Sequence, residues 1–196
     1  MQISAEFVTS AAASRDFPRD RLAEVALVGR SNVGKSSLIN ALVRRQVART
    51  SAAPGKTRLA NFYRVQRGLA PALYLVDLPG YGYARGGDAP AREFNRLTEA
   101  YFARAIAIGA VLLVDARHPG LETDLEAWAW LRSQPCAQAV IGTKADKLTR
   151  AERARHLREL ASVFDIPVPL VSARTGEGLD ELWKLIATLP NQKTAP

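Results

Sequence analysis

One short pattern restricts the possible folds of this chain more than any other feature. Residues 29–36 read Gly-Arg-Ser-Asn-Val-Gly-Lys-Ser and match the GxxxxGK[S/T] pattern of a phosphate-binding loop. The apolar run 24–28 before it is typical of a buried strand, and residues 35–43 after it have the apolar spacing of a helix. A glycine loop between a strand and a helix is the setting in which backbone N–H groups bind phosphate. The pattern therefore predicts a phosphate site at the start of this helix.

The positions of the loop have distinct chemical tasks. Gly29 and Gly34 allow the backbone to turn so that successive N–H groups point at one centre, and the following helix adds the positive end of its dipole. Lys35 supplies a compact cation for the terminal phosphates, and the Ser36 hydroxyl can bind Mg²⁺. These four residues are the first candidates for a nucleotide site.

Predicted strands and helices alternate along the rest of the chain. Apolar or alternating runs predict strands at 61–66, 73–77, 110–115, 138–143 and 168–172, and helical spacing predicts helices at 91–106, 121–132, from 149 onward and at 179–189. Apolar strands between helices are typical of an α/β domain with a largely parallel sheet. We therefore expect a three-layer domain with a mostly parallel six-stranded sheet, one antiparallel edge strand and helices on both faces.

The helix that begins after Thr149 has the clearest start signal. Thr149 and Glu152 form a capping box, and Leu157, Leu160 and Phe164 are expected to face the core. No repeat or linker divides the chain, so we expect residues 22–190 to form one nucleotide-binding domain. Residues 1–21 are expected to be an N-terminal extension that packs loosely or adds an edge, and residues 191–196 a tail.

Composition and charge limit the location and the partners. The single cysteine, Cys136, excludes an intramolecular disulfide and suits a reducing cytosol. The longest uncharged apolar run, 105–114, is too short to span a bilayer, and the N-terminus does not resemble a signal peptide. The net charge is +8, and residues 30–58 contain seven basic residues and no acidic one. A basic excess beside a nucleotide site favours a polyanionic partner, although some of these charges would serve the nucleotide or only a solvated face.

Two further patterns follow predicted strands. The first, Asp77-Leu-Pro-Gly80, is a DxxG pattern: an Asp at a strand end can hold Mg²⁺ through water, and the Gly80 N–H can meet a γ-phosphate. The second, Thr143-Lys-Ala-Asp146, can read a base, because the Asp146 carboxylate can accept from two donors on guanine that adenine does not offer on that edge. The Lys144 stem can cover the base. Each pattern alone also fits an ordinary turn or helix start.

Two weaker candidates complete the site. Backbone N–H groups of residues 172–174, after the last predicted strand, could reach the guanine carbonyl. Thr57 lies in a Pro-Gly-containing basic loop, 47–58, whose composition predicts mobility. Its hydroxyl could reach Mg²⁺ when that loop closes over a triphosphate. Without the other motifs, the 172–174 stretch is nearly uninformative and Thr57 would be read as a solvated loop threonine.

The order and spacing of these motifs resemble the Ras-like, translation-factor-related GTPases. Together they resemble more specifically the EngB (YihA/YsxC) family of bacterial GTPases, over about residues 20–190. The closest matches are residues 29–37, 54–57, 77–83, 115–119 and 143–148. The resemblance implies a cytoplasmic GTP-binding switch with slow GTP hydrolysis, acting in assembly of the large ribosomal subunit and linked to cell division (septation).

The resemblance also implies a set of site residues and cofactors. GTP or GDP would be the ligand and Mg²⁺ the metal, bound by Ser36 and Thr57 and by Asp77 through water. Catalysis would rest on Lys35, Thr57 and Gly80. Nucleotide contacts are implied for Gly29, Arg30, Ser31, Asn32, Val33, Gly34, Lys35, Ser36, Ser37, Gly55, Lys56, Thr57, Asp77, Leu78, Pro79, Gly80, Thr143, Lys144, Ala145, Asp146, Val171, Ser172 and Ala173.

The sequence departs from the general GTPase pattern at two positions. Thr143 replaces the Asn of NKxD, as in the EngB pattern, so guanine specificity should depend on Asp146. Tyr81 stands where Ras-like switches carry the Gln that orients the attacking water, so intrinsic hydrolysis should be slow. Asn32 matches an Asn ligand of potassium-activated relatives, which implies K⁺ as a further cofactor. The alternative is that Asn32 only stabilises the loop by hydrogen bonds.

The expected partners are a precursor of the large ribosomal subunit and ribosomal RNA, bound through the basic stretch 30–58. Within it, Arg44, Arg45, Arg49, Lys56 and Arg58 either contact RNA phosphates or pair with acidic residues such as Glu93 or Glu99. A monomer without stable membrane association is expected. Two other functions stay open on the residues alone: a P-loop enzyme acting on adenosine nucleotides, and an RNA-binding module with a regulatory nucleotide site.

Overall fold

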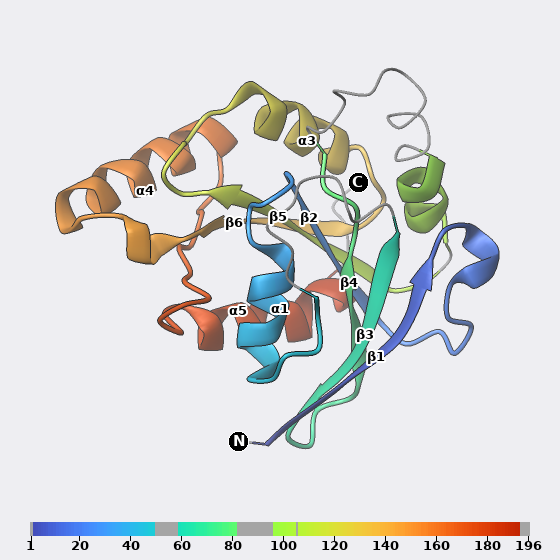
Figure 1. The fold of residues 1–196 in the computed structure, drawn as a ribbon. Coiled ribbons are helices and arrows are strands. Elements are labelled where there is room, and N and C mark those ends of the chain that lie inside the picture. Colours follow the sequence, from blue (N-terminus) through green and yellow to red (C-terminus); the bar gives the residue numbers. More distant parts are fainter. Residues whose placement is uncertain (1, 50–58, 82–95, 105, 193–196) are drawn as a thin grey trace.

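The computed structural model describes residues 2–49, 59–81, 96–104 and 106–192 (Figure 1). The strands are β1 (Ile3–Ala11), β2 (Glu24–Gly29), β3 (Ala60–Arg67), β4 (Leu73–Asp77), β5 (Ile108–Asp115) and β6 (Ala137–Thr143). The helices are α1 (Lys35–Val43), α3 (Glu122–Arg132), α4 (Arg150–Phe164) and α5 (Leu179–Thr188). Residues 96–102 are also helical, and short 3-10 turns span Ser14–Asp16, Ala145–Lys147 and Leu189–Asn191.

The strands form a six-stranded sheet in the order β1-β3-β4-β2-β5-β6. Strands β4, β2, β5 and β6 are parallel, whereas β3 is antiparallel to both of its neighbours. The central strands are buried along their whole length, as the apolar runs indicated. The predicted mostly parallel α/β sheet is confirmed.

The sixth strand is β1, from the N-terminal residues, and not the expected strand at 168–172. That segment joins the sheet through one bridge between Leu170 and Gly142. Pro167 and Pro169 both precede Leu170 and have no backbone N–H to donate, so they limit the pairing. Strand β1 instead pairs along β3 and covers its outer side.

Two helical layers cover the sheet (Figure 1). One core lies under α1 and α5, where Leu38, Ile39 and Trp183 pack with residues of the central strands. The other core lies under α3, α4 and residues 96–102. In α4 one expected core residue is wrong: Leu157 is 38% exposed, and His156 is buried in its place, with Nδ1 hydrogen-bonded to the Ala116 carbonyl at 2.8 Å. In the described part of the chain, no helix combines the length and apolar character that a membrane span requires.

Candidate nucleotide-binding site

The predicted phosphate loop connects β2 to α1, and its backbone depends on two glycines. Gly34 precedes α1 with φ of 113°, which lies in the region that favours glycine. A Cβ atom on Gly29 would lie 2.8 Å from the Leu113 carbonyl oxygen and 2.8 Å from a Val33 methyl group. Asn32, with φ of 63°, completes the turn. The loop therefore packs tightly against β5 while its turn leads directly into the N-terminus of α1.

Lys35 and Ser36 occupy the first turn of α1 with different partners. The Lys35 ammonium donates to the carbonyl oxygens of Gly29 (3.0 Å) and Arg30 (3.4 Å), so it curls back over the loop. Burial lowers the pKa of Lys35, and the charge of Asp77 opposes this effect. The Ser36 hydroxyl donates to Oδ2 of Asp77 at 2.8 Å. The cation, the hydroxyl and the carboxylate predicted from two separate motifs are thus brought together.

Asp77 has the surroundings of a residue that serves a cation. Its side chain is 1% exposed at the end of β4, and burial raises its pKa against the opposing effects of Lys35 and Ser36. Its Oδ1 atom is buried and has no hydrogen-bond partner within the described residues. A hydroxyl oxygen and a partly unpaired carboxylate side by side suit Mg²⁺, which prefers oxygen ligands. The residues present therefore fit the expected metal.

The segment after β4 packs directly against the phosphate loop. A Cβ atom on Gly80 would lie 2.7 Å from the backbone nitrogen of Ser31, so only glycine allows this approach. The Ser31 N–H donates to the Tyr81 carbonyl at 3.2 Å, and Arg30 and Tyr81 form a parallel bridge. Leu78 is fully buried beside them. The DxxG segment and the phosphate loop thus form one continuous surface.

A buried carboxylate that the sequence analysis missed joins these two segments. Oδ1 of Asp124, in the first turn of α3, accepts from the Tyr81 hydroxyl at 2.8 Å and from Nε of Arg30 at 3.1 Å. Asp124 is 1% exposed, and burial raises its pKa against the effects of Tyr81 and Arg30. Burial and the neighbouring Asp124 also raise the pKa of Tyr81. Because these pairs are 43 and 94 residues apart in sequence, no local pattern indicated them.

The predicted base-reading residues follow β6 and are tied to the phosphate loop. The Thr143 hydroxyl donates to the carbonyls of Val33 (2.8 Å) and Val114 (3.1 Å), which gives this position a structural task that threonine can perform. The Ser172 hydroxyl donates to Oδ1 of Asp146 at 2.7 Å, and the Ala145 N–H donates to the Val171 carbonyl at 3.1 Å. These bonds bring the two predicted base-contacting stretches, 143–146 and 171–173, side by side.

Lys144 bridges the same stretch to the phosphate loop. Its ammonium donates to the Asn32 carbonyl at 2.8 Å and lies 3.0 Å from Oδ2 of Asp115. Although burial alone would raise the pKa of Asp115, hydrogen bonds from Arg117 and Lys144 hold it well below its usual range. The charged end of Lys144 is therefore held by the phosphate loop and by the end of β5.

A pocket of about 280 Å³ lies where these segments meet. Its lining comes from the phosphate loop with the start of α1, from the 143–147 stretch and from the 171–174 stretch: Val33, Gly34, Ser37, Leu38, Thr143, Lys144, Asp146, Lys147, Val171, Ala173 and Arg174. The carboxylate of Asp146 is the acceptor that can pair with a base in this pocket. Its Oδ2 lies 3.9 Å from Nη1 of Arg174. The geometry suits a flat, polar base next to a phosphate chain.

Some of the predicted residues lie outside the described ranges. Three of these are predicted nucleotide contacts: Gly55, Lys56 and Thr57. The others are Arg58, a predicted RNA contact, and Glu93, one of the acidic residues that could have paired with the arginines. Within the described residues, Arg44, Arg45 and Arg49 are exposed after α1 and form no ion pair there. The alternative that these three arginines pair with Glu99 is therefore not observed.

Comparison with known proteins places these features in a family. The model of the family described as "50S ribosome-binding GTPase" matches residues 24–144. A "Probable GTP-binding protein EngB" of Pelotomaculum thermopropionicum is 46% identical over 189 residues, which cover 93% of each chain.

Solved structures agree with the fold. Era of Aquifex aeolicus, bound to GDP and AlF4⁻, is 23% identical with a TM-score of 0.71 over 86% of this chain and 57% of that one. Era in complex with MgGDPNP and a segment of 16S ribosomal RNA is 22% identical, with a TM-score of 0.72 over 91% of this chain. The match spans 59% of that second Era chain. At this identity the similarity concerns the fold alone.

Proposed function

This chain belongs to the EngB family of P-loop GTPases, and we propose that it is a slow GTPase switch in assembly of the large ribosomal subunit. The observation that carries the nucleotide part of the proposal is the convergence of Lys35, Ser36 and Asp77 at the start of α1, next to the pocket that Asp146 lines. Phosphate, metal and base chemistry are then available along one continuous surface. The family membership establishes that the chain is a GTP-hydrolysing enzyme.

In the proposed mechanism, catalysis is mainly positioning and charge neutralisation. The loop N–H groups of residues 30–36 and the Lys35 ammonium bind the β- and γ-phosphates. Ser36 and Thr57 would hold Mg²⁺ directly and Asp77 would hold it through water, and the ion would supply positive charge to the phosphates. The Gly80 N–H stabilises the γ-phosphate as charge develops on it.

Slow hydrolysis follows from the position after the DxxG segment. Tyr81 has no amide with which to orient the attacking water, and its hydroxyl already donates to Asp124 at 2.8 Å. Its side chain is therefore held by α3. Intrinsic hydrolysis depends on the remaining groups, and K⁺ near Asn32 is proposed as a further source of positive charge.

The nucleotide specificity is tested by the substitution Asp146→Asn. The change replaces an acceptor of two guanine hydrogen bonds with an amide, so GTP and GDP should bind about 100-fold more weakly. Xanthosine diphosphate, which presents a carbonyl where guanine has its amine, should bind better than to the wild type. Competition against a fluorescent GDP analogue measures both affinities.

The matched control for this test is Asp165→Asn, an exposed aspartate at the end of α4. Its GDP affinity should equal that of the wild type. ATP competing with GDP at similar concentrations would contradict the specificity assigned to Asp146. Membership in a family of GTP hydrolases already disfavours an adenosine-nucleotide enzyme and an RNA-binding module that does not hydrolyse GTP.

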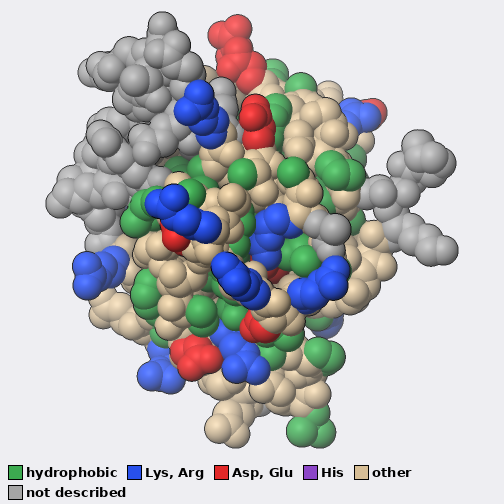
Figure 2. All heavy atoms as spheres, turned by 90° about the vertical axis from the view of Figure 1, so that its right-hand side faces the viewer, with side chains coloured by type: hydrophobic (Ala, Val, Ile, Leu, Met, Phe, Trp, Pro, Cys, Tyr) green, Lys and Arg blue, Asp and Glu red, His purple; other side chains and the backbone are tan. Residues whose placement is uncertain are grey.

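The ribosomal part of the proposal is supported by charge and by the description of the matching family. Lys and Arg side chains predominate over Asp and Glu on the face shown in Figure 2, and the basic excess in the sequence is concentrated in residues 30–58. A basic surface of this kind suits RNA phosphates. The family model describes ribosome-binding GTPases, and an Era of similar fold was solved with ribosomal RNA.

Co-sedimentation with ribosomal particles tests this partner. The protein should sediment with large-subunit particles and not with small ones, and more strongly with a non-hydrolysable GTP analogue than with GDP, because the loop containing Thr57 is proposed to respond to the γ-phosphate. Equal recovery with both nucleotides would contradict the switch, and no recovery with either would contradict the partner.

Further parts of the proposal concern the organisation of the protein in the cell. We take residues 22–190 as the GTP-binding domain, residues 1–21 as an extension that supplies the edge strand, and residues 191–196 as a tail. The protein would act as a cytoplasmic monomer without stable membrane association. Its link to septation would follow from the supply of ribosomes, so depletion should cause large-subunit precursors to accumulate before division is affected.

A further inference from the structure

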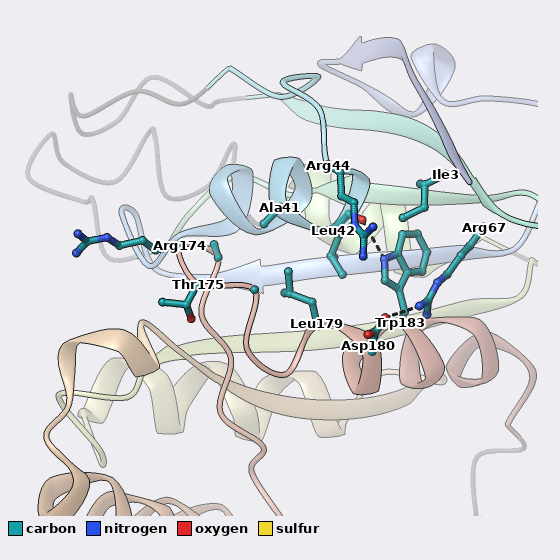
Figure 3. A pocket seen from close by; sticks show the side chains of 12 residues that line it. Ile3, Ala41, Leu42, Arg44, Arg67, Arg174, Thr175, Leu179, Asp180 and Trp183 are labelled. Atoms are coloured by element: carbon teal, nitrogen blue, oxygen red, sulfur yellow. Dashed lines mark hydrogen bonds and ion pairs between the residues drawn. The ribbon is translucent and has the colours of Figure 1, made fainter. Parts of the chain in front are cut away.

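A second cavity, of about 460 Å³, lies beside the base pocket and is larger than it (Figure 3). It is bounded by the end of α1, the first turns of α5, the ends of β1 and β3 and the loop 173–176. Ala173 and Arg174 line both cavities, so this loop separates them. The candidate nucleotide site described above does not use the second cavity.

The cavity carries an excess of positive charge. Arg44, Arg67 and Arg174 line it, with Asp180 as the acidic lining residue. Asp180 pairs with Nη2 of Arg67, whereas Nε of Arg67 has no hydrogen-bond partner within the described residues. Arg44 is exposed and forms no ion pair in the described part of the chain. Figure 3 shows Arg44 and Arg67 directed toward Trp183, while the Arg174 side chain extends away from the cavity.

Another side of the same cavity is an apolar wall. Ile3, Leu42 and Leu179 line the cavity from three different elements, next to the buried ring of Trp183. The Trp183 ring is held by a hydrogen bond from Nε1 to the Leu42 carbonyl at 3.0 Å and by the Arg67 guanidinium at 5.8 Å from its centroid. Cations above an apolar wall suit a ligand that is anionic at one end and flat and weakly polar at the other.

We propose that this cavity binds one nucleotide of single-stranded RNA, with its phosphate between Arg44 and Arg67 and its base against the apolar wall. The inference rests on the proposed binding of ribosomal RNA and assigns it a specific site. Arg44 is the first of three exposed arginines, followed by Arg45 and Arg49. The phosphates of neighbouring nucleotides in the strand can therefore contact these further cations. A single strand is required, because a base inside a duplex cannot enter a cavity.

The same cavity is connected to the guanine-reading carboxylate through one side chain. The backbone N–H groups of Arg174 and Thr175, in the separating loop, donate to the Ser172 hydroxyl at 3.2 and 3.1 Å. That hydroxyl donates to Asp146 at 2.7 Å. RNA that contacts the loop is therefore linked through Ser172 to the Asp146 carboxylate. The two ligands should bind cooperatively, since both contact the same hydrogen-bonded loop.

The experiment uses the full chain with GDP and a fluorescent oligouridylate as the RNA probe. Arg44→Gln removes a cavity cation, and Arg45→Gln removes the neighbouring arginine, which does not line the cavity. Arg158→Gln, on the exposed side of α4, controls for net charge. Arg44→Gln should weaken oligouridylate binding about tenfold. Arg45→Gln should have a smaller effect and Arg158→Gln none. Tryptophan fluorescence should change on binding, and Trp183→Phe should abolish the change.

The coupling is measured in the same samples as the rate of GDP dissociation. Saturating oligouridylate should slow it about fivefold or more in the wild type and not in Arg44→Gln. Equal losses of affinity in Arg44→Gln and Arg45→Gln would overturn the cavity site while leaving RNA binding intact. An oligouridylate that binds without changing GDP dissociation would overturn the coupling. Inorganic phosphate giving the same fluorescence change and the same slowing would overturn RNA as the ligand. Absence of any oligouridylate binding by the wild type would overturn the RNA partner itself.

Discussion

At the scale of single residues, Asp124 shows how one buried carboxylate can hold two functional segments. It accepts from Tyr81, directly after the DxxG segment, and from Arg30 in the phosphate loop. Its other oxygen, Oδ2, is buried without a partner among the described residues. Removing one hydrogen-bond donor from a buried carboxylate leaves its charge less compensated, so the stability of the protein should depend on both Tyr81 and Arg30.

The substitution Tyr81→Phe should therefore lower stability and leave chemistry intact. Loss of the hydroxyl takes one hydrogen bond from buried Asp124 and should reduce the free energy of unfolding by about 1–3 kcal/mol. The kcat for GTP should stay at the wild-type value, because the hydroxyl is held by α3 and does not act on the phosphate. Denaturant unfolding and single-turnover hydrolysis measure the two quantities.

The matched control is Tyr74→Phe. This change removes a hydroxyl that donates to Asp20 at a distance of 2.9 Å, and neither residue belongs to the phosphate loop. It should cost less stability, since Asp20 is more exposed than Asp124. A large fall in kcat for Tyr81→Phe at unchanged stability would show that the hydroxyl takes part in hydrolysis.

The proposed role of Asn32 in K⁺ activation is tested with glycine in its place. Asn32 has φ of 63°, so alanine would add backbone strain, whereas glycine removes the side chain without it. If the amide helps to bind K⁺, hydrolysis should be faster in KCl than in NaCl for the wild type and equal in both salts for Asn32→Gly. Equal wild-type rates in the two salts would leave Asn32 with a structural role only.

At the scale of elements, the ends of β5 and β6 are joined by the ion pair of Asp115 and Lys144. The pair lies 3.0 Å apart and anchors the base-reading stretch to the carboxyl end of β5. Arg117 adds a second cation to the same carboxylate. The orientation of Lys144 over the base pocket thus depends on a strand that is not part of the base-reading motif.

This ion pair predicts a pH dependence. The pKa of Asp115 is lower in the folded protein than in the unfolded chain, so its contribution is present at neutral pH and is lost as the pH falls below about 4 toward the folded value. At neutral pH, Asp115→Asn should lower the free energy of unfolding by about 1–3 kcal/mol. The difference from the wild type should shrink as the medium is acidified.

Urea unfolding at neutral and acidic pH measures this change. Glu126→Gln, at an exposed position of α3, serves as the control and should differ little from the wild type at either pH. A difference between Asp115→Asn and the wild type that is the same at both pH values would mean that packing, and not charge, is responsible.

Helix starts were predicted better than helix faces. The capping box of Thr149 and Glu152 is present, with the Thr149 N–H donating to Glu152 at 2.8 Å. Such a signal involves only neighbouring residues. The expected burial of Leu157 was wrong because the neighbouring His156 finds a carbonyl on another loop, Ala116, and occupies the core position. Which residue of a helix is buried is decided by what lies opposite.

At the scale of the whole molecule, the charge distribution predicts how RNA binding depends on salt. Each phosphate contact that is lost should reduce the log–log slope of affinity against salt by about 0.7–0.9. The triple variant Arg44→Ala/Arg45→Ala/Arg49→Ala should therefore bind large-subunit particles more weakly and with a flatter slope. GDP binding should be unchanged, since none of the three lines the base pocket.

A second triple variant, Arg132→Ala/Arg150→Ala/Arg158→Ala, lowers the net charge equally at exposed positions on α3 and α4. Comparing the salt dependence of the two triple variants distinguishes binding at a defined RNA surface from general electrostatic attraction. Equal slopes for both variants would place the RNA contacts elsewhere on the molecule or spread them evenly over it.

Patterns confined to neighbouring residues were enough to predict the α/β fold and the family from the sequence. The glycine loop, the strand-end Asp77 and the Thr143–Asp146 stretch each depend on local backbone geometry or on one side chain at a strand end, and parallel strands bring their carboxyl ends to one edge. That rule alone predicts that the motifs meet, although it does not predict their hydrogen bonds.

Only the tertiary structure decided the contacts between distant elements. Thr143 reaches the Val33 carbonyl, Asp124 joins Tyr81 to Arg30, and β1 completes the sheet beside β3. The second cavity likewise forms from the ends of four elements, and no segment of the sequence contains its pattern. The physical reason is that hydrophobic periodicity states which face of an element is buried, whereas packing determines which side chains face each other across the buried space.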